Sequence, residues 1–382
     1  SKYWRKLYKM IYLDYSATTK CDKDILDTYV KVSEEYFANS SSQYLLAYQV
    51  KDLIDTATQK VADLFSVKSS EIIYTSSATE ANNTTIKGIV YYQNRTKKII
   101  TSTKIHSSIK ETLKYMNTLG YEVYFLKNDS TGRIDLDDLK KNIMSASLVT
   151  IPLISSEVGI IEDIEEIKKI VKTNSRCLLH VDATQAVGKI LFNMDDIDML
   201  SLSAHKLFGI KNSGMLIKKE KVNLIPLIHG GLSTTIYRSG TADQASIVCM
   251  AKTLRKAFEN VEEKFHYVNK IRQDLIEFFS KYEKIKLNSS TYTSPYILNL
   301  SFLGIKIESF IHKMEEEEIY LSTKSACSND KLLSDEVYSL FNDEERAKTS
   351  FRISISYKTT KEEIIKFKDV FDKVYNLFIN MK

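Results

Sequence analysis

Between about residues 70 and 220 the sequence alternates short β-rich runs with helical patterns, and this alternation restricts the fold more than any other feature. The runs are almost continuously apolar, which is typical of strands that are buried on both faces of a sheet. We predict an α/β domain with a mostly parallel, seven-stranded sheet between helices. The predicted strands are 71–75, 98–101, 122–126, 148–154, 177–182, 198–203 and 214–217, with helices at 106–119, 135–145 and 162–173.

A different order of elements follows this domain. A long helical pattern covers 243–281 and is followed by two strands, a helix at 306–318, further strands near 319–322 and 351–357, and a final helix at 360–380. This order predicts a smaller α+β domain at the C-terminal end. No low-complexity linker separates the two parts, so we expect them to pack tightly. We divide the chain into a large domain, 14–255, and a small domain made of 1–13 and 256–382.

Composition argues against several classes of protein. The 382 residues are 43% hydrophobic, enough for a large core, and the net charge of +5 is not gathered into a basic arm, so we expect no direct contact with nucleic acid. The four cysteines form no CxxC pair and the six histidines no HxH or HExxH motif, so we expect neither disulfides nor a metal site. No apolar run is long enough to span a membrane, and we expect a cytoplasmic protein.

Residues suited to chemistry follow the ends of the predicted strands, where ligands of parallel sheets bind. Lys206 closes one strand behind a serine and a histidine. A lysine that is shielded from water loses its proton easily and forms a Schiff base, although most single lysines are surface cations. Asp182 ends another strand, and a buried carboxylate there needs either a cation, such as a protonated ring nitrogen, or several hydrogen-bond donors.

Two further positions have both a functional and a structural interpretation. The small residues 76–79 lead from a strand into a helix, whose N-terminus would bind an anion such as phosphate. Alternatively, Ser76 or Ser77 simply caps that helix. His106 follows a strand end, where its ring would lie flat on a bound aromatic ring or would serve as a cap.

In combination, seven segments resemble the pyridoxal-phosphate enzymes of aminotransferase class V, and within them the NifS/IscS-like cysteine desulfurases. The ordered set covers almost the whole chain, so it is more specific than any one motif. The segments are 12–19 (YLDYSATT), 71–83 (EIIYTSSATEANN), 181–185 (VDATQ), 203–206 (SAHK), 238–241 (RSGT), 325–328 (SACS) and 351–354 (FRIS). The fold type of this family, with a large cofactor-binding domain and a small domain, agrees with the predicted architecture.

The resemblance implies a role for each matching residue. Lys206 would hold pyridoxal 5'-phosphate as an internal aldimine, and Asp182 would keep the pyridine nitrogen protonated so that the ring accepts electrons. His106 would stack on the ring and assist proton transfer, and Gln185 would bond the ring hydroxyl oxygen. The phosphate and substrate contacts implied are Ala78, Thr79, Ser203, His205 and the partner subunit's Thr241 for the phosphate, and Arg352 and Ser156 for the substrate, with Arg352 clamping its carboxylate.

Cys327 distinguishes a desulfurase from a transaminase, which needs no thiol. It lies in the small, polar segment 323–330, and Lys324 favours its thiolate. Cys177 and Cys249 have apolar neighbours, as buried structural cysteines do. We interpret Cys327 as the nucleophile that takes sulfur from L-cysteine as a persulfide and releases L-alanine. The Arg- and His-containing signature of the SufS group is absent.

The resemblance further implies a homodimer that delivers sulfur to an acceptor protein, either an iron–sulfur scaffold or a tRNA-thiolation enzyme. Several family positions differ here: Ser156 replaces an asparagine, Ser77 a glycine and Tyr44 a histidine. Asn212 replaces another glycine and still tolerates a left-handed backbone. Two alternatives therefore stay open: another class V enzyme, such as a selenocysteine lyase or an aminotransferase, and a non-catalytic scaffold homologue.

Overall fold

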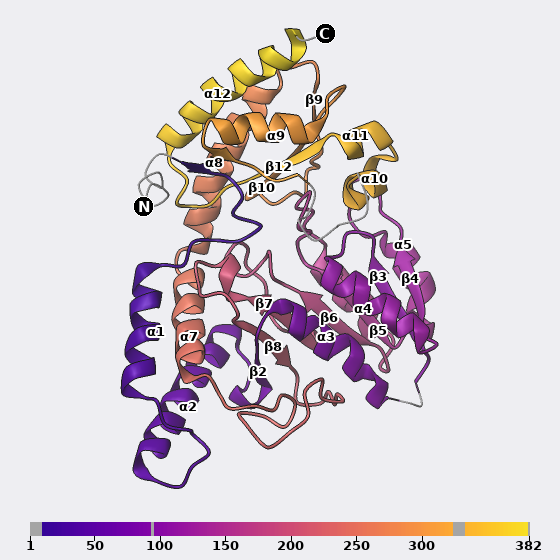
Figure 1. The fold of residues 1–382 in the computed structure, drawn as a ribbon. Coiled ribbons are helices and arrows are strands. Elements are labelled where there is room, and N and C mark those ends of the chain that lie inside the picture. The colour runs from indigo at the N-terminus through magenta and orange to yellow at the C-terminus, as the bar shows by residue number, and fades with distance from the viewer. Residues whose placement is uncertain (1–9, 93–94, 324–332, 381–382) are drawn as a thin grey trace.

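The computed structural model describes residues 10–92, 95–323 and 333–380, and its largest layer is a seven-stranded sheet (Figure 1). The strand order is β2-β8-β7-β6-β5-β3-β4, in which β8 runs antiparallel to both its neighbours and the other pairs are parallel. The prediction of a mostly parallel, seven-stranded sheet is confirmed. The strands are β2 (Ile72–Thr75), β3 (Lys98–Ser102), β4 (Glu122–Leu126), β5 (Leu148–Pro152), β6 (Leu178–Asp182), β7 (Met199–Ser203) and β8 (Gly214–Lys218).

Helices cover both faces of this sheet, because successive side chains of each strand point to opposite sides. Leu148, Leu178 and Met199 pack with α3 (Ala78–Gly88) and α4 (Ser107–Thr118). Their neighbours along the strands, Val149, Leu179 and Leu200, belong to a second apolar cluster on the other face. The helices that contribute to this second cluster are α2 (Leu45–Phe65), α5 (Leu136–Asn142), α6 (Ile164–Lys172) and α7 (Gln244–Phe258), and α1 (Lys23–Glu35) packs against α7.

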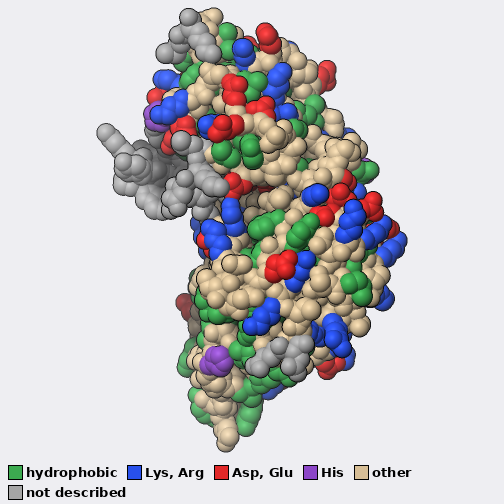
Figure 2. Space-filling model, turned by 90° about the vertical axis from the view of Figure 1, so that its right-hand side faces the viewer, with side chains coloured by type: hydrophobic (Ala, Val, Ile, Leu, Met, Phe, Trp, Pro, Cys, Tyr) green, Lys and Arg blue, Asp and Glu red, His purple; other side chains and the backbone are tan. Residues whose placement is uncertain are grey.

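The C-terminal part forms a smaller α+β unit with a core of its own, above the large sheet in Figure 1. Its antiparallel sheet has the order β12-β10-β9, and Ile11 and Leu13 join its core. The elements are β9 (Ile285–Leu287), β10 (Ile297–Phe302) and β12 (Ser350–Ser354), with α8 (Val261–Phe279), α9 (Ile307–Glu316) and α12 (Lys361–Asn380). No described helix combines the length and the apolar character needed to span a membrane. Acidic and basic side chains lie interspersed on the face shown in Figure 2.

Three features of the structure are absent from the sequence-based prediction. The expected helix 243–281 is two helices, because Asn260 between α7 and α8 has a left-handed backbone (φ 53°). The strand β11 (Ile319–Tyr320) does not join the three-stranded sheet but pairs in parallel with β1 (Ile11–Tyr12). The short helices α10 (Asp335–Phe341) and α11 (Glu344–Lys348) were not predicted, since neither is long enough to show a clear helical period.

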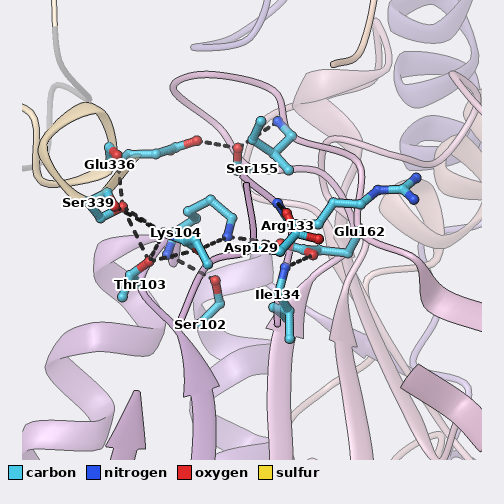
Figure 3. Close-up of polar contacts among 12 residues, drawn as sticks. Ser102, Thr103, Lys104, Asp129, Arg133, Ile134, Ser155, Glu162, Glu336 and Ser339 are labelled. Atoms are coloured by element: carbon cyan, nitrogen blue, oxygen red, sulfur yellow. Dashed lines mark hydrogen bonds and ion pairs between the residues drawn. The ribbon is translucent and has the colours of Figure 1, made fainter. Parts of the chain in front are cut away.

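Helix α10 docks on the loop that follows β5, through a buried carboxylate (Figure 3). Glu336 accepts hydrogen bonds from the Ser155 hydroxyl and from the N–H groups of Glu157 and Val158, the latter at 3.2 and 3.0 Å. Beneath this contact, Lys104 and Glu162 form a fully buried ion pair with an N–O distance of 3.2 Å. The contacts of Glu336 fix α10 to the carboxyl end of the large sheet.

The ionisation of Glu336 predicts a pH-dependent stability. Burial, followed by the charge of Glu157, raises the pKa of Glu336 from 4.5 to about 7, although its donors favour the ionised form. Because the folded pKa exceeds the unfolded one, the folded state holds the proton more tightly, and stability falls as pH rises from about 4.5 to about 7. The free energy of unfolding of Glu336→Gln, relative to that of wild type, should therefore rise by roughly 3 kcal/mol when the pH is raised from 5 to 8. Denaturant unfolding at both pH values measures this, and a pH-independent difference would contradict it.

Candidate active site

A cavity of about 260 Å³ opens at the carboxyl ends of β2, β5, β6 and β7. It collects residues from segments that are far apart in the sequence, as expected for a site at this edge of a parallel sheet. Of the residues predicted from the sequence, those that line it are Ala78, Thr79, His106, Ser156, Asp182, Gln185, Ser203, His205 and Lys206.

Lys206 ends the short turn that follows β7, and its half-buried side chain reaches the cavity. The amine donates hydrogen bonds to the backbone carbonyls of Ser16 and Ala17, the latter at 2.7 Å. These carbonyls come from the segment before α1, which lies about 190 positions away in the chain. The N-terminal segment thus holds the amine in place, and sequence patterns gave no signal of this contact.

Asp182 is the last residue of β6 and is 7% exposed. Its carboxylate accepts hydrogen bonds from the side-chain amide of Asn82 and from the N–H of Thr184, both at 3.0 Å. Asn82 lies within α3 and is fully buried, a position where an amide needs a partner. Two neutral donors compensate only part of the cost of burying this charge, so the carboxylate retains capacity for a cationic ligand in the cavity.

The N-terminus of α3 faces the same cavity. Ser77 caps this helix by accepting a hydrogen bond from the N–H of Glu80 at 3.1 Å, and the N–H of Ala78 donates to the Ser203 hydroxyl at 2.8 Å. Capping therefore belongs to Ser77 and not to Ser76. The helix dipole gives this end of the cavity a positive potential that favours an anion.

Two histidines flank the cavity as hydrogen-bonding groups. Burial lowers the pKa of His205 to about 4, so its imidazole is uncharged at neutral pH, and its Nδ1 lies 3.0 Å from the Thr18 hydroxyl oxygen. His106 is the N-cap of α4, and its Nδ1 accepts a hydrogen bond from the N–H of Ser108 at 3.1 Å. The cap fixes the position of the His106 ring at the cavity wall.

Gln185 lies between the cavity and a second lysine. Its Nε2 donates to the carbonyl of Ser16 and its Oε1 accepts from Lys189, both at 2.9 Å. Arg352, on β12, is 4% exposed and does not line the cavity. Its guanidinium donates to the carbonyl of Ser156 at 2.7 Å and pairs with Asp14 at 2.9 Å.

Like Arg352, the predicted residue Thr241 does not line this cavity. Thr241 lines a separate one of about 130 Å³, together with Ser76 and Arg238. Cys327 lies outside the described residues. The sequence interpretation also missed Asn82 and the carbonyls of Ser16 and Ala17, because all three act through contacts with distant segments.

Comparisons with known proteins agree with this geometry. The family model "Aminotransferase class-V" matches residues 11–367. The chain is 37% identical over 366 residues to a cysteine desulfurase IscS of Buchnera aphidicola subsp. Acyrthosiphon pisum (strain 5A), covering 93% of this chain and 90% of the relative. Among solved structures, a NifS-like protein superposes with a TM-score of 0.89 at 29% identity, covering 97% of this chain and 99% of the other. SspA in complex with cysteine superposes with a TM-score of 0.79 at 26% identity, covering 91% of this chain and 99% of the other.

Proposed function

This chain belongs to the aminotransferase class V family and is a cysteine desulfurase of the IscS/NifS type, and we propose that the cavity at Lys206 is its catalytic centre. The family consists of pyridoxal-phosphate enzymes, and we assign that cofactor to this cavity. One observation carries the assignment: an amine, a buried carboxylate and a helix N-terminus face the same space, at Lys206, Asp182 and Ala78.

The residues that line the cavity fit pyridoxal phosphate. Its phosphate suits the N-terminus of α3, with Thr79, Ser203 and His205 as further donors. Its protonated ring nitrogen suits the Asp182 carboxylate, whose hydrogen-bond donors among the described residues, the Asn82 amide and the Thr184 N–H, are neutral. Thr184 lines the same cavity, and its hydroxyl has no hydrogen-bond partner among the described residues, so the protein leaves one polar atom for a ligand.

Each residue then has a defined task in the conversion of L-cysteine to L-alanine. The bound cofactor supplies an electron-accepting ring. Lys206 and His106 would move protons at the substrate, and Gln185 would donate to the ring oxygen. Arg352 would clamp the substrate carboxylate, and Ser156 would be a further substrate contact. In the structure, the Arg352 guanidinium donates to the Ser156 carbonyl and pairs with Asp14.

The sulfur leaves through Cys327. Its thiolate would attack the sulfur of the bound L-cysteine and form a sulfur–sulfur bond. The carbon–sulfur bond would break with its electron pair staying on the substrate carbon, which takes up a proton, so that the substrate leaves as L-alanine. The Cys327 persulfide is then donated to an acceptor protein, an iron–sulfur scaffold or a tRNA-thiolation enzyme. We further propose a homodimer in which the partner subunit's Thr241 completes the phosphate site, and the domain division 14–255 against 1–13 with 256–382.

Replacing Cys327 by alanine is the direct test of this route. With L-cysteine and a reductant, we expect wild type to form alanine and sulfide in equal amounts, and Cys327→Ala to lose about 10²-fold in turnover because the nucleophile is gone. Mass spectrometry without reductant would show one added sulfur atom on wild type only.

Cys21→Ala is the matched control, since Cys21 is the one cysteine that is not buried among the described residues. It should keep both turnover and the added sulfur. Full turnover in Cys327→Ala would disprove the persulfide route and favour another class V reaction. No alanine from wild type with bound cofactor would disprove L-cysteine as the substrate.

A further inference from the structure

A second lysine, Lys189, is connected to the catalytic lysine through side-chain and backbone contacts. Its amine donates to Oε1 of Gln185 at 2.9 Å, and Nε2 of the same amide donates to the carbonyl of Ser16 at 2.9 Å. Lys206 donates to that same carbonyl. Lys189 is therefore separated from Lys206 by one side chain and one backbone carbonyl.

The turn before Lys189 contains a glycine that determines where the Lys189 side chain lies. Gly188 has a left-handed backbone (φ 69°), and a Cβ atom there would lie 2.8 Å from the side chain of Ala257 on α7. Only glycine fits both conditions without strain. The close approach of this turn to α7 directs Lys189 into the protein, toward Gln185.

Lys189 and Lys206 line a small cavity of about 40 Å³, which is distinct from the cavity of the proposed cofactor site but shares Lys206 with it. The only carboxylate that lines it among the described residues, Asp22, bonds Lys256 at 2.6 Å and also Lys358. No ion-pair partner of Lys189 occurs in the described part of the chain, and its amine lies over the ring of Tyr296 at 5.7 Å. The other titratable groups facing this cavity are Tyr15, Tyr357, Lys256 and Lys264.

The contact with Gln185 has a directional consequence. A glutamine amide can present either its donor or its acceptor to a neighbour, whereas a lysine amine in its charged form only donates. In its charged form Lys189 therefore fixes Oε1 on its own side, and Nε2 must point toward Ser16 and the cavity of Lys206. That is the orientation in which Gln185 donates to an oxygen of a bound ring.

The charges have a second consequence. Burial lowers the pKa of Lys189 to about 7, and the nearby charges of Lys206 and Arg352 lower it further. Such repulsion is mutual, so a proton on Lys189 disfavours a proton on the nitrogen of Lys206. Lys189 is thus coupled to two residues of the proposed site.

We propose that Lys189 is a positioning residue of the desulfurase reaction, which orients the Gln185 amide toward the cofactor and disfavours protonation of the Lys206 nitrogen. This inference rests on the proposed cofactor site. Both effects keep the Lys206 nitrogen reactive at neutral pH without contact between Lys189 and the substrate.

The test is a pH titration of the absorption band of the bound cofactor in the purified holoenzyme. In Lys189→Met, we expect the midpoint to rise by about one pH unit, the size of one like charge at moderate distance in a protein. The dissociation constant of the cofactor should also rise several-fold, because Gln185 is no longer oriented. Lys189→Arg should return the midpoint toward that of wild type.

Two further variants make the result specific. Lys189→Gln keeps an N–H donor for Gln185 but not the charge, so it should keep the affinity for the cofactor and still shift the midpoint. It also serves in place of Lys189→Met if that variant does not fold. Lys264→Met is the matched control, because Lys264 lines the same cavity but donates to the carbonyl of Lys256 at 2.8 Å.

An unchanged midpoint in both Lys189→Met and Lys189→Gln, or an equal shift in Lys264→Met, would overturn the inference. A wild-type protein that shows no cofactor band at all would instead overturn the proposed cofactor site. The two failures are therefore distinguishable.

Discussion

Lys206→Met is expected to lose at least about 10⁴-fold in turnover of L-cysteine, the upper range for removal of a positioned proton-transfer group. In the proposed mechanism Lys206 both anchors the cofactor and moves protons at the substrate, so one substitution would remove two functions. Methionine keeps much of the apolar stem and removes the amine that bonds Ser16 and Ala17. The variant should also lose the absorption band of the covalently bound cofactor, measured by spectroscopy of the purified protein.

Lys218→Met provides the comparison for this experiment. Lys218 lies on the adjacent strand β8, is 3% exposed, and bonds the carbonyls of Lys219 and Val222 at the opposite end of the sheet. Its replacement should affect stability without removing the cofactor band. A Lys206→Met protein that retains both the band and turnover would disprove the assignment of the catalytic centre.

Local sequence patterns predicted the large sheet well, because each of its strands is short, apolar and bounded by a turn or a helix. The site residues at strand ends followed from the same rule, as with Asp182 after β6 and Lys206 after β7. Asn212 was expected to tolerate a left-handed backbone in place of glycine, and its φ is 57°. Each of these predictions depends only on residues that are neighbours in the sequence.

Contacts between distant segments were beyond such reasoning. Nothing near Asn82 in the sequence indicates that its amide bonds Asp182, which lies 100 positions later. The pairing of Arg352 with Asp14 spans 338 positions. The break at Asn260 was also missed, since apolar residues continue through it and only the backbone conformation separates α7 from α8.

The smaller α+β unit is connected to the candidate site through the N-terminal segment. Ile11 and Leu13 pack in its core, and the segment that follows them supplies the carbonyls of Ser16 and Ala17 to Lys206. Asp14, next to that core segment, holds the guanidinium of Arg352. A movement of the small domain would therefore act on Lys206 and on Arg352 together.

Asp182→Asn should lower turnover by about 10² to 10³-fold, the range found when one preorganised electrostatic partner of a transition state is removed. Asparagine keeps the shape of the side chain but loses the negative charge that would hold the cofactor ring nitrogen in its protonated form. An amide also cannot accept from both Asn82 and Thr184 as the carboxylate does, so we expect a loss of stability of about 1 kcal/mol. Steady-state kinetics and denaturant unfolding measure the two effects separately.

Asp198→Asn separates the catalytic part of this effect from the structural part. Asp198 is 6% exposed, against 7% for Asp182, accepts from the N–H of Leu179 at 2.8 Å and pairs with Lys221 at 2.8 Å, just before β7. Its replacement should destabilise the protein at least as much and leave turnover of the folded enzyme near that of wild type. Equal losses of turnover in the two variants would mean that Asp182 acts on stability alone, because the charge at the cavity would then make no difference to the reaction.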